Sequence, residues 1–373
     1  MTRSVVKGKD IVLTSEGCRL RRERLVKRFP KVGPLLLNDS LNLRYFANCY
    51  VDPFSQGADF GALLLLQPDG RSTLYYDARV RASAEASHVD ELVPIEWYNG
   101  SSPGDGPPRL ALRHHVVDRV GTNGRIHDSI TDPLAKDVWQ YVEEARRAKD
   151  ADEVEQLREC IRVAEAGHAW GRANVKAGMT ELHVYDGIFA ACTQAAGRPV
   201  IVYGDFAVSP GVSRQGGMPT RRVLRDGEMM ILDFSVVMQG YRSDFTNTVV
   251  VGGRPSPEQE RLYNLCVSAL GAGEKALRPG ALCLDVYNAV REAFVEAGIA
   301  AHFPHHAGHG LGLSHPEAPF FVPHATQTLI VGDVVTLEPG LYVDGVGGIR
   351  IEHNYLITKD GCTRLTNHHI ALS

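Results

Sequence analysis

Four acidic residues share two similar sequence settings that lie far apart in the chain. Asp233 and Glu338 each end an apolar run, and each lies six residues after a glycine. Asp244 and Glu352 then follow, each closing a Gly-x-Arg-x-acid segment. Apolar runs of this kind predict buried strands, and burying an unpaired carboxylate is costly. The pattern therefore predicts four carboxylates that share bound cations.

Two β-hairpins would bring these acids into pairs. In the first hairpin, a turn at residues 238–239 would place Asp233 directly opposite Asp244. In the second, a three-residue turn would place Glu338 opposite Glu352. Directly opposed side chains lie about 4.5–5.5 Å apart at Cβ, where like charges repel each other. Four carboxylates arranged in this way can hold two divalent ions.

A histidine-rich segment could complete such an oxygen-rich ligand set with one imidazole. His305, His309 and His315 are separated by even numbers of residues, so they would share one face of an extended strand. His306 is out of phase with them, and we interpret it as structural. His353 faces away from the acids by the same rule.

Arg350 would point where Glu352 points, because residues two apart on a strand share a face. We expect it to fix that carboxylate by a charge-assisted hydrogen bond. The glycine-rich run 308–312 lacks the ending of a phosphate-binding loop and the spacing of a dinucleotide fingerprint. The chain also has no HExxH or GxSxG motif, which excludes the familiar zincin and serine-hydrolase interpretations.

Composition places the chain among globular proteins. It has 373 residues, of which 44% are hydrophobic and 23% charged, and this length suggests two domains. The net charge of −4 excludes a nucleic-acid binder that works by bulk positive charge. No apolar run reaches the roughly 18–20 residues that span a bilayer. The seven cysteines are scattered and the N-terminus lacks a secretory signal, so we expect a cytoplasmic protein without nucleic-acid or membrane partners.

The chain divides into a mixed α/β region at 1–150 and an internally repeated region at 151–373. A β-hairpin is predicted from 61–66 and 72–76, on either side of a Pro-Asp-Gly turn. Asp150 and Glu153 form a capping-box pattern that predicts a helix start at the boundary. In the repeated region, helices are predicted to begin at Ser256-Pro257 and to cover 285–297, and strands are predicted at 229–234, 246–251, 334–337 and 349–358.

Short motifs around these residues resemble those of the pita-bread metallopeptidases (M24 type), which include methionine aminopeptidases, aminopeptidase P, prolidase and creatinase. The motifs are Leu-Asp-Phe at 232–234, Ser-Asp-Phe-Thr at 243–246, Gly-His-Gly-Leu-Gly at 308–312, Thr-Leu-Glu-Pro-Gly at 336–340 and Arg-Ile-Glu at 350–352. The resemblance implies a pseudo-twofold pita-bread catalytic domain at 151–373. It also implies five metal ligands, in the order Asp233, Asp244, His309, Glu338 and Glu352.

The N-terminal region resembles the creatinase/prolidase-type N-terminal domain at Asn38-Asp-Ser-Leu-Asn-Leu-Arg-Tyr45. Methionine aminopeptidases lack that domain, so the resemblance favours the branch of Xaa-Pro aminopeptidase, prolidase and creatinase. Members of this branch are typically homodimers, and we expect a homodimer here. The fold class expected is therefore α/β (α+β), with a small creatinase-type domain at 1–150 before the pita-bread domain.

The function implied is a dinuclear-metal-dependent hydrolase that cleaves the Xaa-Pro bond of small peptides, as a dipeptidase or an aminopeptidase. Two ions bridged by Asp244 and Glu352 would hold a hydroxide, because such ions lower the pKa of water from about 15.7 towards 7. Manganese is the first choice of metal, with cobalt, zinc or iron as alternatives. Glu338 would act as the base, and His305 and His315 would orient the scissile amide and stabilise its oxyanion.

The sequence departs from the family pattern near the first aspartate. The branch usually has a histidine some seventeen residues before it, and Gly216 occupies that position here. Ser235 also replaces the usual glycine after Asp233. These departures keep open a creatinase-like or other C–N hydrolase that acts on a small non-peptide amide. A non-catalytic pita-bread binding module is the third interpretation, although such modules typically lose the ligands that this chain keeps.

Overall fold

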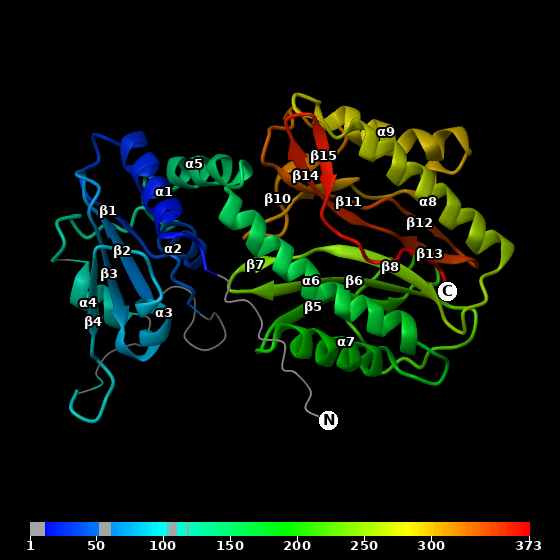
Figure 1. Ribbon diagram of the computed structural model, residues 1–373, viewed down its shortest axis with the longest axis horizontal. Helices are drawn as coiled ribbons and strands as arrows, with labels where there is room; N and C mark the ends of the chain where they lie inside the picture. The colour runs from blue at the N-terminus through cyan, green and yellow to red at the C-terminus, as the bar shows by residue number, and fades with distance from the viewer. Residues whose placement is uncertain (1–11, 52–60, 103, 105–109, 118) are drawn as a thin grey trace. The chain divides into compact units, whose positions relative to one another are not determined.

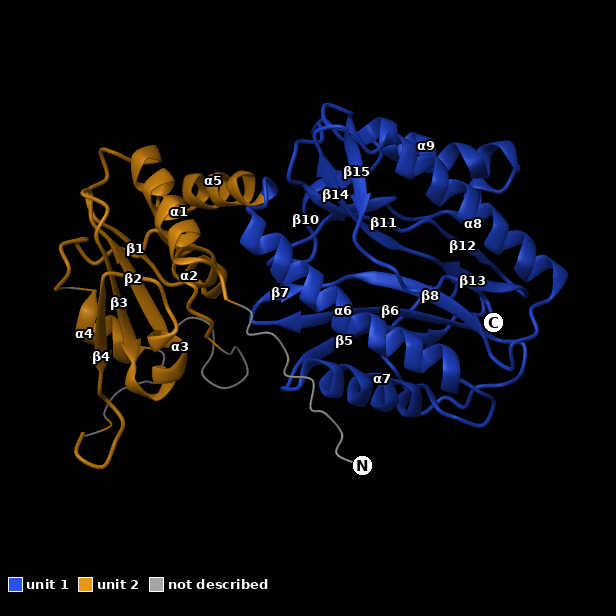
Figure 2. Cartoon of the chain, viewed as in Figure 1, with its two compact units in different colours: residues 1–10, 147–373 blue, residues 11–146 orange. Residues whose placement is uncertain are grey.

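The computed structural model describes residues 12–51, 61–102, 104, 110–117 and 119–373. The chain forms two compact units (Figure 2), one of Ile11–Arg146 and the other, in its described part, of Arg147–Ser373. Among the described residues, no helix combines the length and the apolar character that crossing a bilayer requires.

The smaller unit is built on a four-stranded sheet in the order β1-β2-β3-β4. The predicted hairpin is confirmed, because β2 and β3 pair antiparallel on either side of the turn at residues 67–71. Apolar side chains of these strands, such as Leu63 and Leu65, pack on Leu112 and Val116 of α4. The elements are α1 (Ser15–Arg28), β1 (Leu35–Leu37), α2 (Ser40–Ala47), β2 (Ala62–Leu66), β3 (Ser72–Asp77), η1 (Ala78–Val80), α3 (Arg81–Glu85), β4 (Glu91–Ile95), α4 (Ala111–Val116) and α5 (Ala135–Arg147).

Helix ends in the larger unit follow the capping signals of the sequence. α6 begins after Asp150 with the predicted capping box to Glu153, and α8 begins after Ser256 with proline in its first turn. α9 begins at Cys283 rather than at residue 285. The elements are α6 (Ala151–Asn174), α7 (Glu181–Ala196), β5 (Ile201–Val208), β6 (Met229–Met238), β7 (Tyr241–Arg242), β8 (Phe245–Val250), α8 (Pro257–Ala276), α9 (Cys283–Glu296), η3 (Ala300–His302), β9 (Gly308–Gly310), β10 (Glu317–Phe321), β11 (Val334–Leu337), β12 (Gly340–Val343), β13 (Gly347–Arg350), β14 (His353–Thr358) and β15 (Gly361–Arg364).

The larger unit repeats a helix pair followed by strands. In the first half, α6 packs on α7, and β5, β7 and β8 pair with β6. In the second half, α8 packs on α9, the strands run in the order β10-β9-β11-β14-β15, and β12 pairs with β13. Figure 1 shows the two helix pairs flanking the strands on opposite sides. The expected mixed α/β fold is confirmed, and the larger unit shows the internal repeat that the sequence pattern predicted.

One predicted strand is divided in two. The run 349–358 forms the end of β13 and the whole of β14, and these two strands pair with β12 and β11 respectively. The division falls at Glu352, whose backbone N–H donates to the carbonyl oxygen of Thr246 at 3.1 Å. The contact turns Glu352 out of its own ladder and towards β8. The prediction of a continuous strand was wrong because the partner of this amide lies in the other half of the unit.

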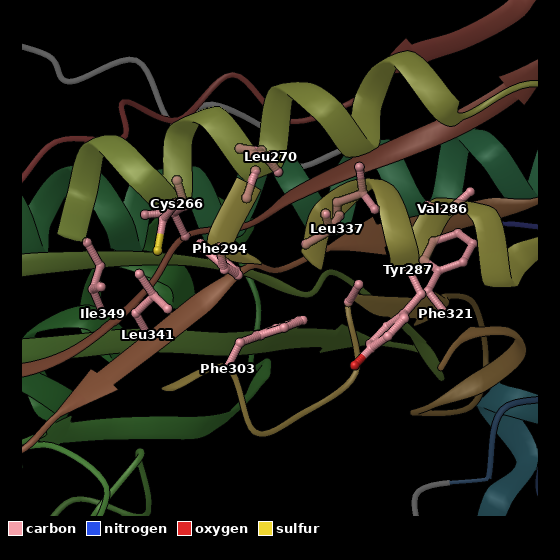
Figure 3. Packing of buried hydrophobic residues seen from close by; sticks show 14 of the residues in the cluster. Cys266, Leu270, Val286, Tyr287, Phe294, Phe303, Phe321, Leu337, Leu341 and Ile349 are labelled. Atoms are coloured by element: carbon pink, nitrogen blue, oxygen red, sulfur yellow. The ribbon is translucent and has the colours of Figure 1, made fainter. Parts of the chain in front are cut away.

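A buried apolar cluster fixes α8 and α9 on the strands of the second half. Phe294 is fully buried in it, and Gly273 lets α8 approach so closely that a Cβ there would lie 2.6 Å from Val290 Cγ2. Burying such side chains contributes about 1.5–3 kcal/mol each. Figure 3 labels Cys266, Leu270, Val286, Tyr287, Phe294, Phe303, Phe321, Leu337, Leu341 and Ile349 in this cluster.

Truncating the cluster should destabilise the larger unit. We expect Phe294→Ala to lower its free energy of unfolding by about 3–5 kcal/mol, because the cavity left behind cannot collapse fully. Phe189→Ala is the matched control, since Phe189 is 38% exposed on α7. Urea unfolding followed by circular dichroism measures both. Equal losses for the two variants would contradict the cluster's role.

Candidate metal centre

The acids, histidines and arginine singled out from the sequence meet in one cavity of about 540 Å³ in the larger unit. β6 and the segment after β7 supply the first two acids, and the chain around β11 and β13 supplies the other two. The histidines come from the segment around β9. The lining includes Asp233, Asp244, His305, His309, His315, Glu338, Arg350 and Glu352.

The register of the first hairpin differs from the prediction. Val237 pairs with Arg242, so the turn lies one residue later than expected and Asp233 faces Thr246 instead of Asp244. Asp244 lies in the gap between β7 and β8, outside the ladder. The later turn is explained by Gln239 and Gly240, which both adopt positive φ angles of 48° and 90°.

The register of the second hairpin matches the prediction. Leu337 pairs with His353 and Gly340 pairs with Arg350, so the same alignment runs through both ladders. Glu338 therefore faces Glu352 in the interval between them. This hairpin could be predicted because a three-residue turn with Gly345 at a φ of 80° fixes its alignment locally.

Contacts between the halves hold the acids together. Thr246 of β8 donates from its hydroxyl to Glu352 Oε2 at 2.7 Å, and Asn354 donates from its side chain to the carbonyl oxygen of Asp244. As a result Asp233, Asp244 and Glu352 each offer an oxygen within 4.8 Å of the others. The second oxygen of Glu352, Oε1, is buried and has no hydrogen-bond partner among the described residues.

His309 is oriented as a metal ligand would be. Its Nδ1 lies 2.8 Å from the carbonyl oxygen of Gly310, to which it can only donate. Nε2 then carries a lone pair, and it faces Asp244 Oδ2 at 3.5 Å and Glu338 Oε1 at 3.6 Å. A lone pair aimed at two carboxylate oxygens is repulsive unless a cation lies among them. The donor set of one imidazole and four carboxylates therefore fits divalent cations.

The remaining histidines divide between the cavity and the protein interior. His315 donates from Nε2 to Asp244 Oδ2 at 2.8 Å, and His305 donates from Nδ1 to the carbonyl oxygen of His306 at 2.7 Å. His306 itself lines the cavity with Nδ1 3.4 Å from a Glu338 oxygen, so its interpretation as structural was incomplete. His305, His306 and His315 reach the cavity from loops, because β9, the strand in this segment, covers only Gly308–Gly310. His353 contacts Thr366 and lies outside the cavity lining, as expected.

Arg350 has different partners from those predicted. Its Nε donates to Asp233 Oδ2 at 2.8 Å and its Nη2 donates to Asp205 Oδ2 at 2.7 Å. Nη1 donates to the Tyr342 hydroxyl at 2.7 Å. The predicted bond to Glu352 was wrong, because the chain leaves the strand geometry at residue 351 and the two side chains no longer share a face.

The cavity concentrates more negative charge than its own cations offset. Burial, and then the charges of the neighbouring carboxylates, raise the pKa of Glu338 and Glu352 well above their usual range. Burial also raises the pKa of Asp233, although Arg350 opposes the shift. Burial acts in the same direction on Asp244, but His315 and His309 outweigh it and its pKa is lowered.

Sequence reasoning missed four further side chains that line the cavity or contact Arg350. Tyr203 and Asp205 lie on β5, a strand that was not predicted, and Gln215 lies in the segment after it. Tyr342 of β12 is buried against Arg350 and His305. A signal existed for β5, because Asp205 is an acid within the apolar run Ile-Val-Tyr-Gly-Asp-Phe-Ala-Val. Nothing local indicated which face of that run would be buried.

Comparison with known proteins decides the family. Residues 155–359 match the metallopeptidase family M24. The chain belongs to this family. An uncharacterized peptidase of Staphylococcus aureus is 32% identical over 341 residues, which cover 88% of this chain and 93% of the relative. The M24 chain is thus an enzyme of a metal-dependent peptidase family, and the resemblance stated from its motifs is confirmed.

Solved structures show the same fold over almost the whole chain. An Xaa-Pro dipeptidase from Bacillus anthracis superposes with a TM-score of 0.76 at 22% identity, covering 96% of this chain and 99% of that one. A dipeptidase PepE from Mycobacterium ulcerans gives 0.71 at 25% identity, covering 96% and 98%. A histidine-to-alanine variant of aminopeptidase P from Escherichia coli gives 0.74 at 18% identity, covering 96% and 97%. The pita-bread fold is therefore confirmed.

Metal removal should make the stability of the M24 chain depend on pH. Without a cation, the folded state binds protons at Glu338 and Glu352 more tightly than the unfolded chain, whose glutamates titrate near 4.5. These two groups therefore contribute a fall in the stability of chelator-treated protein as pH rises from about 4.5 to neutrality, while buried histidines such as His305, whose pKa is lowered to about 3, contribute a rise. Thermal unfolding across this range measures the slope.

Glu352→Gln should remove the downward contribution of residue 352, since the amide carries no charge to bury, so the stability of the variant should fall less or rise more with pH than that of wild type. Glu292→Gln, on the exposed face of α9, is the control and should keep the wild-type slope. Manganese should raise the melting temperature more at pH 7 than at pH 5, because the metal competes with protons for the same oxygens. Parallel slopes for wild type and Glu352→Gln would refute the proposed charge imbalance.

Proposed function

We propose that the M24 chain is a dinuclear-metal-dependent hydrolase that cleaves the Xaa-Pro bond of small peptides, as a dipeptidase or an aminopeptidase. One observation carries the proposal: the His309 Nε2 lone pair faces the oxygens of Asp244 and Glu338 in a cavity of about 540 Å³. The cavity is of a size that accepts a small peptide. The structural likeness to an Xaa-Pro dipeptidase supports the choice of substrate class.

The five proposed metal ligands are Asp233, Asp244, His309, Glu338 and Glu352. Bound divalent ions would supply Lewis-acid polarisation of the scissile carbonyl and activation of water. We propose manganese as the native metal, because oxygen ligands predominate in the set. The chain's own part is to keep these oxygens converged, and the contact of Thr246 with Glu352 supports this role.

Glu338 is the proposed general base. It follows directly after β11, with Oε1 3.6 Å from His309 Nε2 and 3.4 Å from His306 Nδ1. Besides holding metal, it would accept a proton from the attacking water.

His305 and His315 are proposed to orient the scissile amide and to stabilise its oxyanion. Burial, and then the charge of Arg350, lower the pKa of His305 to about 3, so its ring is neutral at physiological pH. Its Nδ1 donates to a backbone carbonyl and its Nε2 accepts from the Tyr342 hydroxyl at 3.2 Å, so these two bonds fix the ring at the cavity wall. His315 donates its Nε2–H to Asp244 Oδ2 at 2.8 Å, and this N–H would be released to an oxyanion when a cation takes that oxygen.

Arg350 is proposed to position Asp233 and not Glu352. Its Nε and Nη2 atoms both lie close to Asp233 Oδ2, at 2.8 and 2.5 Å. This geometry supports a guanidinium that fixes the direction of one ligand oxygen. Lysine could not replace it, because an ammonium cannot reach Asp233, Tyr342 and Gln215 at once.

The creatinase/prolidase-like assignment of residues 1–150, the homodimer and the cytoplasmic location also stay proposals. Alignment with the Staphylococcus aureus peptidase over 88% of the chain supports a two-domain enzyme of this branch. Gel filtration with light scattering would test the homodimer directly. A monomer at micromolar concentration would contradict it.

The substrate class is tested with purified protein and manganese. We expect hydrolysis of Xaa-Pro dipeptides or of longer peptides with proline second, and loss of activity with a chelator. Peptides with alanine in place of proline are the control for specificity. No turnover on any proline peptide would refute the substrate assignment while leaving the metal site testable by elemental analysis.

A hydrolase acting on a small non-peptide amide is the second candidate. The observation that favours it is Gly216, which stands where the family usually has a histidine that helps to bind the reacting amide. Turnover of amidines or small amides without turnover of proline peptides would support it. A creatinase-like mechanism proceeds without metal, so persistence of that activity in chelator would separate the two mechanisms.

The role of Glu338 gives a sharper test. Glu338→Gln should lower kcat by about 10²- to 10⁴-fold, the usual contribution of a general base. Elemental analysis of the same sample measures its separate effect on metal content. Glu296→Gln, at the exposed end of α9, is the control and should retain wild-type kcat. Unchanged turnover in metal-loaded Glu338→Gln would exclude the residue as base.

A further inference from the structure

Asp205 is an acid on the partly buried strand β5, and it has no role in the proposed chemistry. It lies on β5 directly opposite Asp233 in the ladder with β6. Gly204 allows this close approach, since a Cβ there would lie 2.2 Å from the Asp233 carbonyl oxygen. The Asp205 side chain lines the cavity and is 33% exposed. It is therefore a carboxylate that a bound substrate can reach.

The Asp205 carboxylate occupies the space of the missing side chain at residue 216. A Cβ on Gly216 would lie 2.0 Å from Asp205 Oδ2, which is closer than any real contact. The glycine segment is held there by the bond from the Phe206 N–H to the carbonyl oxygen of Gly217, at 2.9 Å. A side chain at 216 would therefore have to displace the Asp205 carboxylate. In this chain the space beside Gly216 is filled by a carboxylate.

The charge of Asp205 is only partly offset. Its Oδ2 accepts a hydrogen bond from Arg350 Nη2 at 2.7 Å, but Asp233 shares the same guanidinium. Among the described residues, no hydrogen bond reaches Asp205 Oδ1. The single positive charge of Arg350 offsets one of the two carboxylates, Asp205 and Asp233. A positively charged group of the substrate would offset the other.

The neighbouring wall suits an alkyl chain that ends in a cation. Tyr203 lies two residues earlier on β5, so its ring shares a face of the strand with Asp205. Both residues line the cavity, together with Gln215, Gly216 and Gly217. Aromatic surface and glycine backbone beside a carboxylate offer apolar contact and then a charge-assisted hydrogen bond.

We propose that Asp205 is a specificity-determining residue that binds an ammonium or guanidinium group on the first residue of the substrate. The inference rests on the proposed peptidase function. The cation has two possible sources, the α-amino group and a lysine or arginine side chain. A merely positioning role through Arg350 is the competing explanation, and Asp233, Tyr342 and Gln215 already hold that guanidinium without Asp205.

Asp205→Asn tests the inference with lysyl-proline and norleucyl-proline, which differ in the terminal ammonium. If the side chain is bound, wild type should show a roughly 10- to 100-fold lower KM for the lysyl peptide, and the variant should lose this preference. If the α-amino group is bound, the variant should raise both KM values by similar factors. A fall in kcat alone, or unchanged KM values, would overturn the proposal.

Asp186→Asn is the matched control, because it removes the same charge from the exposed face of α7 and should leave the KM ratio unchanged. Gly216→Ala is the second variant. Its methyl group must displace the Asp205 carboxylate, so it should change KM in the same direction as Asp205→Asn. A Gly216→Ala protein with wild-type KM values for both peptides would contradict the geometry.

A binding experiment separates this inference from the proposed function. Isothermal titration of manganese-loaded protein with lysine and with norleucine needs no turnover, so it remains informative if no peptide is cleaved. Tighter binding of lysine, or weaker binding of both in Asp205→Asn, supports a cation site. Equal affinities that Asp205→Asn leaves unchanged would overturn it, even in a protein that hydrolyses proline peptides.

Discussion

Repulsion among buried carboxylates is the constraint on which the rest of the M24 chain's structure depends. Asp233, Asp244, Glu338 and Glu352 converge from four places in the sequence into one cavity. Burial raises the pKa of three of them, so protons or cations must offset their charge at neutral pH. The His309 Nε2 atom faces two of these oxygens, so one cation could offset their charge and accept its lone pair at once. A fold that tolerates this arrangement sacrifices stability in the absence of metal.

The duplicated architecture explains how the fold stays stable despite the repulsion among these carboxylates. The second half buries its apolar strands beneath α8 and α9, in a cluster that also includes Met229 and Val250 of the first half, so apolar burial joins the halves independently of the charged cavity. The polar contacts are concentrated where the halves meet, as in the bonds of Thr246 to Glu352 and of Thr248 to Arg350. Asp233 thus lies within a strand and the other three acids lie directly beside strand ends, and hydroxyls and amides tie them together. This division keeps the site's geometry fixed while its net charge changes with metal.

Arg350 and Asp205 show that the surroundings of the site have been altered while its acids are kept. The guanidinium joins Asp233 to Asp205, and the Asp205 carboxylate fills the space above Gly216. Glycine at 216 and the acid at 205 belong together sterically, since a side chain at 216 would have to displace that carboxylate. The four converging acids are constrained by their mutual repulsion, whereas the wall beside them is shaped by steric fit.

The sequence by itself determined what depends on neighbouring residues. The caps at Asp150 and Ser256, the hairpin in the smaller unit and the alignment of Glu338 with Glu352 all follow from local turn and capping chemistry. Residue types and spacing also identified the acids and histidines of the cavity. Only the tertiary structure decided the later turn of the first hairpin, and with it the pairing of Asp233 with Thr246.

The tertiary structure alone likewise decided the division of the strand at Glu352, the partners of Arg350 and the presence of Asp205 and His306 in the cavity. These features share one physical reason. Each depends on a hydrogen bond or a steric contact between segments that are distant in sequence, and neither hydrophobic period nor turn chemistry reports such a contact. The proposed metal ligands could therefore be identified from the sequence, whereas the residues that line the cavity beside them could not.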